Sequence, residues 1–239
     1  MDNYLRGIKL REAVPPTSYL ADIPAIRYLA SVPQLSFHKP VTFLVGENGT
    51  GKSTILEAIA IAMGFNAEGG SWDFTFSTTP THSELHEYIT TIKTVRPKDG
   101  FFLRAESFYN AASYLENTST LQRYGGVSFH KQSHGESFLS LIAYRFGGEG
   151  LYLLDEPEAA LSPQRLMSLI VAIDDLVERD SQFIIATHSP ILMAYPNSEI
   201  LQFSDFGIQK VAYQDTENYQ ITKQFLNKPE QMIRYLLKK

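Results

Sequence analysis

Runs of consecutive apolar residues alternate along the chain with segments in which apolar residues recur every three or four positions. The runs predict buried strands at residues 40–45, 101–103, 151–154 and 183–186. The periodic segments predict helices at 53–63, at 135–146 and from Pro163 onward, where Ser162 is a helix cap. Strands without polar alternation, separated by helices, predict an α/β fold with a parallel sheet covered on both faces.

A glycine-rich loop joins the first predicted strand to the first predicted helix. It fits the pattern G-x-x-x-x-G-K-[ST], in which converging backbone N–H groups and a helix N-terminus hold phosphate. We expect Lys52 to reach the β- and γ-phosphates, Ser53 to ligate Mg²⁺ and Thr54 to contact the α-phosphate. The alternative is an ordinary glycine loop. The predicted phosphate-binding residues are Gly46, Glu47, Asn48, Gly49, Thr50, Gly51, Lys52, Ser53 and Thr54.

Two carboxylates and a histidine follow the last two predicted strands. Asp155 and Glu156 come directly after Leu151–Leu154, and His188 comes just after the strand that ends at residue 186. The carboxyl ends of parallel strands line the ligand crevice of an α/β sheet. We therefore expect Asp155 to hold Mg²⁺, Glu156 to act as general base, and His188 to contact the γ-phosphate or the attacking water. A solvated acidic turn and a structural histidine are the alternatives.

Ser133-His134-Gly135-Glu136 opens the predicted helix that precedes this acidic pair. Ser133 offers a hydroxyl, Gly135 an unobstructed backbone N–H, and the helix its positive end. This predicts a second anion site on the same chain. A plain helix cap, with Ser133 capping and Glu136 at the third position, is compatible with that interpretation.

Composition narrows the choice of protein class. The 239 residues include no cysteine and carry a formal charge of −5, with 44% hydrophobic and 20% charged residues. The absence of cysteine excludes disulfides and thiol catalysis, and the charge argues against a chain wrapped in nucleic acid. No apolar run is long enough to cross a bilayer, and no signal peptide is visible. We expect a cytoplasmic protein without direct membrane insertion.

These motifs together resemble those of the ABC-type ATPase superfamily. Residues 46–53 match its Walker A loop, 133–136 its signature, 151–156 its Walker B strand with the catalytic glutamate, 159–162 its D-loop and His188 its switch histidine. The resemblance implies a P-loop ATPase core with a helical signature subdomain. It further implies a homodimer that forms head to tail around two ATP molecules with Mg²⁺. We expect a single domain over residues 1–239, with a helical or inserted lobe at about 65–145.

Two details indicate a branch of that superfamily. The signature ends in Glu136, and His188 is followed by Ser189 and Pro190. Both are more similar to the SMC, RecF and OLD-type branch than to transporter ATPases, although a coiled-coil arm is missing. The chain resembles small stand-alone ATPases of the AAA_21/AAA_23 type. This implies a switch for DNA, or for a nuclease or other effector protein, in DNA maintenance or defence. The alternative is the ATP-binding subunit of an ABC transporter.

Some positions of the family pattern stay open. No glutamine stands clearly at the glutamine loop, so Glu106 is the first candidate there, as a ligand near Mg²⁺, and Gln122 the second. A surface glutamate is an equal alternative for Glu106. Tyr19 or Tyr28 could stack on adenine, but core packing is the expected fate of either.

Overall fold

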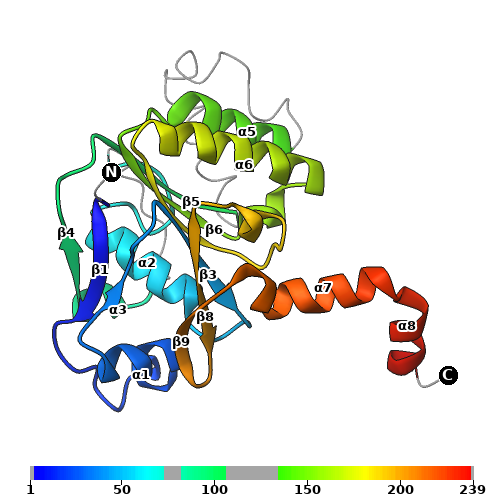
Figure 1. Cartoon of the computed structure of the whole chain (residues 1–239). Helices are drawn as coiled ribbons and strands as arrows, with labels where there is room; N and C mark the ends of the chain where they lie inside the picture. The colour runs from blue at the N-terminus through cyan, green and yellow to red at the C-terminus, as the bar shows by residue number, and fades with distance from the viewer. Residues whose placement is uncertain (1–2, 73–81, 106–133, 238–239) are drawn as a thin grey trace.

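A six-stranded sheet forms the centre of the protein (Figure 1). The computed structural model describes residues 3–72, 82–105 and 134–237. The strand order is β5-β6-β7-β3-β8-β9, and all neighbours are parallel except β8 and β9. The mostly parallel sheet predicted from the sequence is thereby confirmed. Its strands are β3 (Val41–Gly46), β5 (Asp99–Arg104), β6 (Gly150–Asp155), β7 (Gln182–Ala186), β8 (Ser198–Ser204) and β9 (Gly207–Val211).

The register of the central strands aligns their carboxyl ends. Arg104 lies opposite Asp155, Asp155 opposite Ala186, and Ala186 opposite Leu44. These four residues therefore form one row across β5, β6, β7 and β3. The residues that follow them along the chain leave the sheet at the same edge, which places the sequence motifs side by side.

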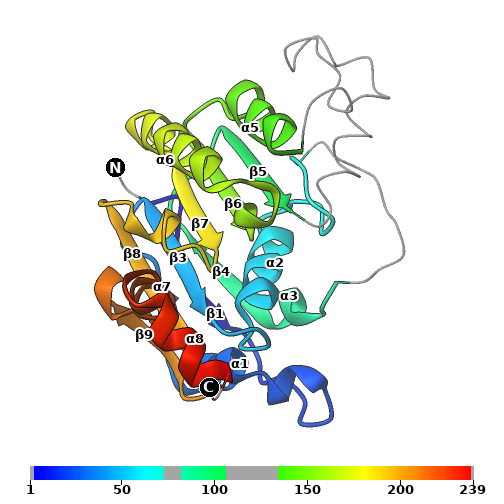
Figure 2. The ribbon, with the colours of Figure 1, turned by 90° about the vertical axis from the view of Figure 1, so that its right-hand side faces the viewer.

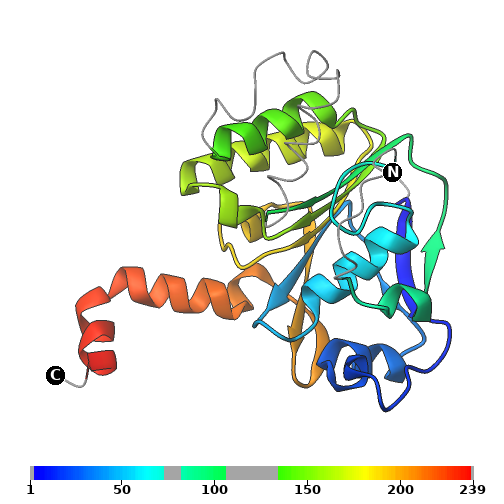
Figure 3. The same ribbon diagram turned by 180° about the vertical axis from the view of Figure 1, so that it is seen from behind.

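Two helices, α5 (His134–Arg145) and α6 (Pro163–Glu178), cover one face of this sheet (Figure 3). The Ser162 side chain accepts a hydrogen bond from the backbone N–H of Arg165, as its predicted capping role requires. The predicted apolar face of α6 is buried at Leu166, Leu169 and Ile173, and is partly buried at Ile170 and Val177. This face packs with Phe138 and Leu141 of α5 and with the sheet residues Val41, Phe43, Val45, Leu103 and Leu154.

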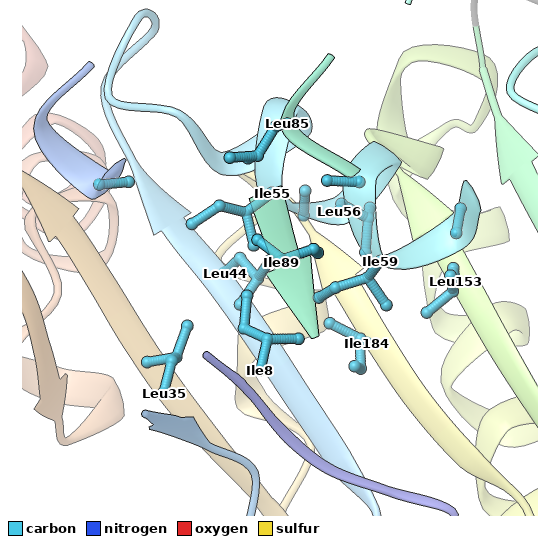
Figure 4. Close-up of a cluster of buried hydrophobic side chains, with 14 of the residues drawn as sticks. Ile8, Leu35, Leu44, Ile55, Leu56, Ile59, Leu85, Ile89, Leu153 and Ile184 are labelled. Carbon is cyan, nitrogen blue, oxygen red and sulfur yellow. The ribbon is translucent and has the colours of Figure 1, made fainter. Parts of the chain in front are cut away.

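The opposite face carries α2 (Lys52–Ala62), which a second sheet covers from outside. That sheet is antiparallel, with the order β2-β1-β4, and the sequence did not predict it. Its strands are β1 (Leu5–Leu10), β2 (Leu35–Ser36) and β4 (Ile89–Lys93). Figure 4 shows Ile55, Leu56 and Ile59 of α2 between the two sheets. The neighbours contributed by the sheets include Ile8, Leu35, Leu44, Ile89, Leu153 and Ile184. The phosphate-loop helix is therefore packed against apolar side chains on both sides.

Shorter elements and a C-terminal extension complete the described fold. The last two helices, α7 (Glu217–Asn227) and α8 (Pro229–Leu237), project from the body (Figures 1 and 3). The predicted lobe at 65–145 remains a prediction, and its described part includes the sheet strands β4 and β5. The other elements are η1 (Tyr19–Asp22), α1 (Pro24–Ser31), α3 (Leu85–Tyr88), η4 (Pro157–Ala160), η5 (Leu192–Ala194) and η6 (Tyr213–Asp215).

Candidate functional site

The glycine-rich loop bends sharply from β3 into α2. Gly46 and Gly51 have φ angles of 139° and 101°, a region that side chains with a Cβ rarely adopt. A Cβ on Gly51 would also lie 2.6 Å from Cγ2 of Ile23. The loop is closed further by Thr50, whose hydroxyl donates to the carbonyl oxygen of Glu47 at 2.8 Å. The predicted strand–loop–helix context of the phosphate motif is thus present.

Lys52 folds back over this loop. Its ammonium group donates to the carbonyl oxygens of Gly46 and Glu47, each at 2.8 Å. Burial lowers the pKa of Lys52 from its ordinary value, while the nearby carboxylates of Glu156 and Asp155 oppose the shift. A cation held on neutral carbonyl oxygens can exchange them for phosphate oxygens, which form stronger, charge-assisted hydrogen bonds.

Ser53 and Asp155 meet across the sheet edge. The Ser53 hydroxyl donates to Oδ1 of Asp155 at 2.9 Å, so two residues that are 102 positions apart in sequence are in direct contact. A hydroxyl and a carboxylate are oxygen ligands of the kind that Mg²⁺ prefers. The pair therefore fits the predicted metal site.

An arginine that the sequence analysis missed stands beside this pair. The Arg104 guanidinium contacts Oε2 of Glu57 at 2.7 Å and Oδ2 of Asp155 at 3.5 Å. Glu57 also accepts a hydrogen bond from the backbone N–H of Ser83 at 2.9 Å. Arg104 thus links α2, β5 and β6 at the edge where the metal site is predicted. A charged residue that ends an otherwise apolar strand was the available signal.

Glu156 follows Asp155 in a left-handed backbone conformation, with φ 50° and ψ 52°. For a residue with a Cβ this costs about 1–2 kcal/mol. Its backbone N–H donates to the carbonyl oxygen of Ala186, and its Oε1 lies 3.6 Å from Nε2 of His188. Within the described part of the chain, Nε2 of His188 is buried without a hydrogen-bond partner. The strain and the unpaired nitrogen mark the place where a base and a polar contact to a ligand are predicted.

Two further residues hold the His188 segment, and the sequence analysis missed both. Glu158 accepts hydrogen bonds from the Thr187 hydroxyl and from the backbone N–H of His188. On the opposite side, the Asn218 amide of α7 donates to the carbonyl oxygen of His188 at 3.1 Å. Both side chains therefore fix the backbone that presents the histidine. Glu158 was detectable as a third acid next to the Asp-Glu pair, whereas Asn218 carried no signal.

The signature segment is only partly described. Ser133 lies outside the described residues, and α5 begins at His134. A Cβ on Gly135 would lie 2.5 Å from a guanidinium nitrogen of Arg165, so this position has a packing constraint of its own. Glu136 pairs with Arg165 at 3.0 Å. The ligand roles of Ser133, Gly135 and Glu136 stay predictions.

Of the remaining candidate residues, some lie within the described part of the chain and others do not. Glu106 and Gln122 lie outside the described residues. Thr54 lies in the first turn of α2, where the phosphate motif requires it. Tyr28 packs partly buried against the core, as expected, but the expectation is wrong for Tyr19, which is 62% exposed because it lies on the surface helix η1.

Comparisons with known proteins agree with this geometry. Residues 25–135 match the AAA_23 family model, described as "AAA domain". Residues 122–194 match the AAA_21 model, described as "AAA domain, putative AbiEii toxin, Type IV TA system". No curated protein matches the chain. The predicted AAA_21/AAA_23 resemblance is confirmed.

Solved structures confirm the predicted ABC-ATPase-like fold. CbiO1 from Clostridium perfringens, part of the ABC transporter complex CbiONQ, is similar with a TM-score of 0.52, 16% identity and full coverage of both chains. A second structure, "An inward-facing conformation of a putative metal-chelate type ABC transporter", has a TM-score of 0.51 and 16% identity, over 92% of this chain and 88% of that chain. The SMC head domain from Thermotoga maritima, also 16% identical, covers 74% of this chain and 92% of its own, with a TM-score of 0.42. At 16% identity, the first two of these structures establish the fold alone. No helix among the described residues is both long and apolar enough to span a membrane.

Proposed function

We propose that this chain, a P-loop ATPase domain with an ABC-ATPase-like fold, hydrolyses ATP with Mg²⁺ and dimerises head to tail on ATP. The observation that carries the proposal is the 2.9 Å hydrogen bond between Ser53 and Asp155. It brings the end of the phosphate loop to the end of β6, next to Glu156 and His188. The phosphate-binding loop, the proposed metal ligands and the proposed general base then belong to one site.

The proposed roles follow from where each side chain lies. Lys52 exchanges its carbonyl partners for the β- and γ-phosphate oxygens. Ser53 and Asp155 would hold Mg²⁺, which when bound neutralises charge that develops on the phosphates. Glu156 accepts a proton from the attacking water, and His188, 3.6 Å from it, orients that water or the γ-phosphate. Arg104 keeps Asp155 in position from the side away from Ser53.

A second copy completes the site in this proposal. In this proposal the positive end of α5, together with Gly135 and the preceding Ser133 of the sequence, offers an anion site to the nucleotide of the other copy. In a two-fold dimer, each copy offers this helix end to the other copy's nucleotide, because the same surfaces meet twice. ATP would then hold the dimer together, and hydrolysis would release it.

The biological output proposed is a switch for an effector in DNA maintenance or defence. The description of the model matched by residues 122–194 names a toxin–antitoxin system, which supports defence. The similar structures from ABC transporters keep the transporter subunit as the second candidate. Affinity capture with Glu156→Gln separates the two candidates. A nuclease or DNA-processing partner supports the switch, and a membrane permease supports the transporter.

The test of the ATPase-dimer proposal compares two variants. Glu156→Gln should bind ATP, hydrolyse it slowly and run as a dimer in size exclusion with ATP and Mg²⁺. Ser133→Arg should bind ATP with unchanged affinity but stay monomeric and turn over poorly. A monomeric Glu156→Gln chain, or normal turnover in Ser133→Arg, would contradict the shared site.

Binding of double-stranded DNA provides an independent measurement on the effector. If DNA is the direct partner, its binding affinity should fall steeply with salt, because phosphate contacts release counterions. A salt-insensitive or absent interaction would indicate a protein effector instead.

A further inference from the structure

Helices α7 and α8, residues 217–237, form a C-terminal arm that stands away from the body (Figures 1 and 3). Neither helix contains a buried residue. Their 11 and 9 residues fall short of the roughly 12–15 that an isolated helix needs to be stable in water. The described part of the chain holds the base of the arm through Asn218 and Tyr219, and the rest of the arm lacks the packing that short helices need.

The arm carries large apolar side chains on its surface. Leu226, Tyr235 and Leu236 are each more than 70% exposed. Large exposed apolar side chains gathered on one element favour a site of association. The full set on the arm is Ile221, Phe225, Leu226, Ile233, Tyr235, Leu236 and Leu237.

The base of the arm adjoins the nucleotide loop. Asn218 donates to the carbonyl oxygen of His188, and a cavity of ≈ 210 Å³ separates α7 from Gly46 and Glu47. Ile221 of α7 also lines this cavity. In Figure 2 the arm lies on the viewer's side, as do the ends of β3, β6 and β7 and the start of α2. The arm thus rises from the face that carries the phosphate loop.

We propose that the arm binds a second copy of this chain. The inference rests on the proposed head-to-tail dimer, in which the second copy approaches this same face. The eleven residues of α7 extend about 16 Å. A helix of this length that stands out from the face meets a second copy approaching the same face, and must therefore lie against that copy. Closure on ATP then covers the apolar surface of the arm.

The difference in net charge between the arm and the rest of the chain also supports a second copy as the binding partner. The arm, residues 217–237, carries three cationic and two anionic side chains, a net +1, and Lys238 and Lys239 follow it in the sequence, whereas residues 1–216 carry 16 and 24, a net −8. An arm of one sign and a body of the other attract between copies as well as within one. A cationic amphipathic helix can also bind an anionic lipid surface, so membrane binding is a competing outcome of the test.

The absence of cysteine makes a direct test clean. A photo-crosslinker is attached to Tyr235→Cys in the Glu156→Gln background, with Val95→Cys as the control. Val95 is 61% exposed but precedes the start of β5, at the edge of the sheet opposite the phosphate loop. With ATP and Mg²⁺, the Tyr235 label should give a covalent dimer on a denaturing gel, and the Val95 label little or none.

Different failures have different meanings. If Glu156→Gln runs as a dimer but the Tyr235 label does not reach a second chain, the arm inference alone is overturned. If Glu156→Gln never dimerises, both the proposed function and the arm inference fall.

Charge insertion gives a second measurement. Leu236→Asp with Leu237→Asp should weaken ATP-dependent dimerisation at least about tenfold, while ATP affinity stays within about twofold, because these side chains are exposed in the single chain. Val95→Asp, at the opposite edge of the sheet, should leave dimerisation unchanged. Stronger dimerisation in the arm variant would overturn the inference, since the arm would then be an obstruction. The inference would also be overturned if the unmodified protein co-sedimented with phosphatidylserine vesicles while the arm variant dimerised as strongly as the unmodified protein.

Discussion

Replacing Arg104 by glutamine should destabilise the protein more than removing the charge of an exposed ion pair does. Its partners Glu57 and Asp155 have side chains only 9% and 8% exposed, so Arg104→Gln leaves two nearly buried carboxylates without their cation. Losing one partner of a buried ion pair costs about 3–5 kcal/mol. Because the Arg104 side chain is itself 24% exposed, solvent screening reduces the expected loss to about 2–3 kcal/mol.

The chain offers a matched control for this measurement. Lys98 and Glu149 are paired at 2.7 Å, but their side chains are 74% and 51% exposed. Lys98→Gln should therefore leave the free energy of unfolding almost unchanged. Urea unfolding of the ligand-free protein, monitored by circular dichroism, measures both variants. We attribute the large effect of Arg104→Gln on the free energy of unfolding to the burial of its partners. An equal decrease in both variants would refute this explanation, because it would show that pairing alone matters.

Three further variants test the candidate site. Lys52→Ala should abolish ATP binding by calorimetry, a loss of at least about 100-fold, since it removes the cation for two phosphates; unchanged affinity would overturn the phosphate-loop assignment. Gly51→Ala should lower stability by about 1–3 kcal/mol and weaken ATP binding, because its Cβ would approach Ile23 at a φ of 101°; a wild-type melting curve would contradict this. Glu158→Gln should lower kcat with little change in KM, because it loosens the backbone that presents His188; a change confined to KM would show that Glu158 acts on binding.

The parts of this protein that the sequence predicts best are those with a single strong signal. Strands β3, β6 and β7 are buried on both faces, so their apolar runs identified them to within about a residue. Because parallel strands end at one edge, the meeting of Ser53 with Asp155 and the approach of Glu156 to His188 followed from the motif order.

The parts that were missed depend on contacts between distant segments. Strand β1 pairs with β4 across 79 to 88 residues of sequence, and neither strand has a regular alternation of burial that would identify it alone. Arg104 was marked only as a charged residue at the end of an apolar strand and Asn218 was not marked at all, and the fold shows that they reach Asp155 and His188. Helices α7 and α8 lack buried residues, so no core position marked them.

The position of α2 between two sheets holds this helix in place. Ile55, Leu56 and Ile59 are fully buried between the sheets, so any displacement of α2 would open voids on one side and overlaps on the other. Lys52 and Ser53 belong to this helix and keep its position. We therefore expect Lys52 and Ser53 to keep their position when a nucleotide binds, so that any change of shape in the proposed ATP cycle takes place elsewhere in the chain.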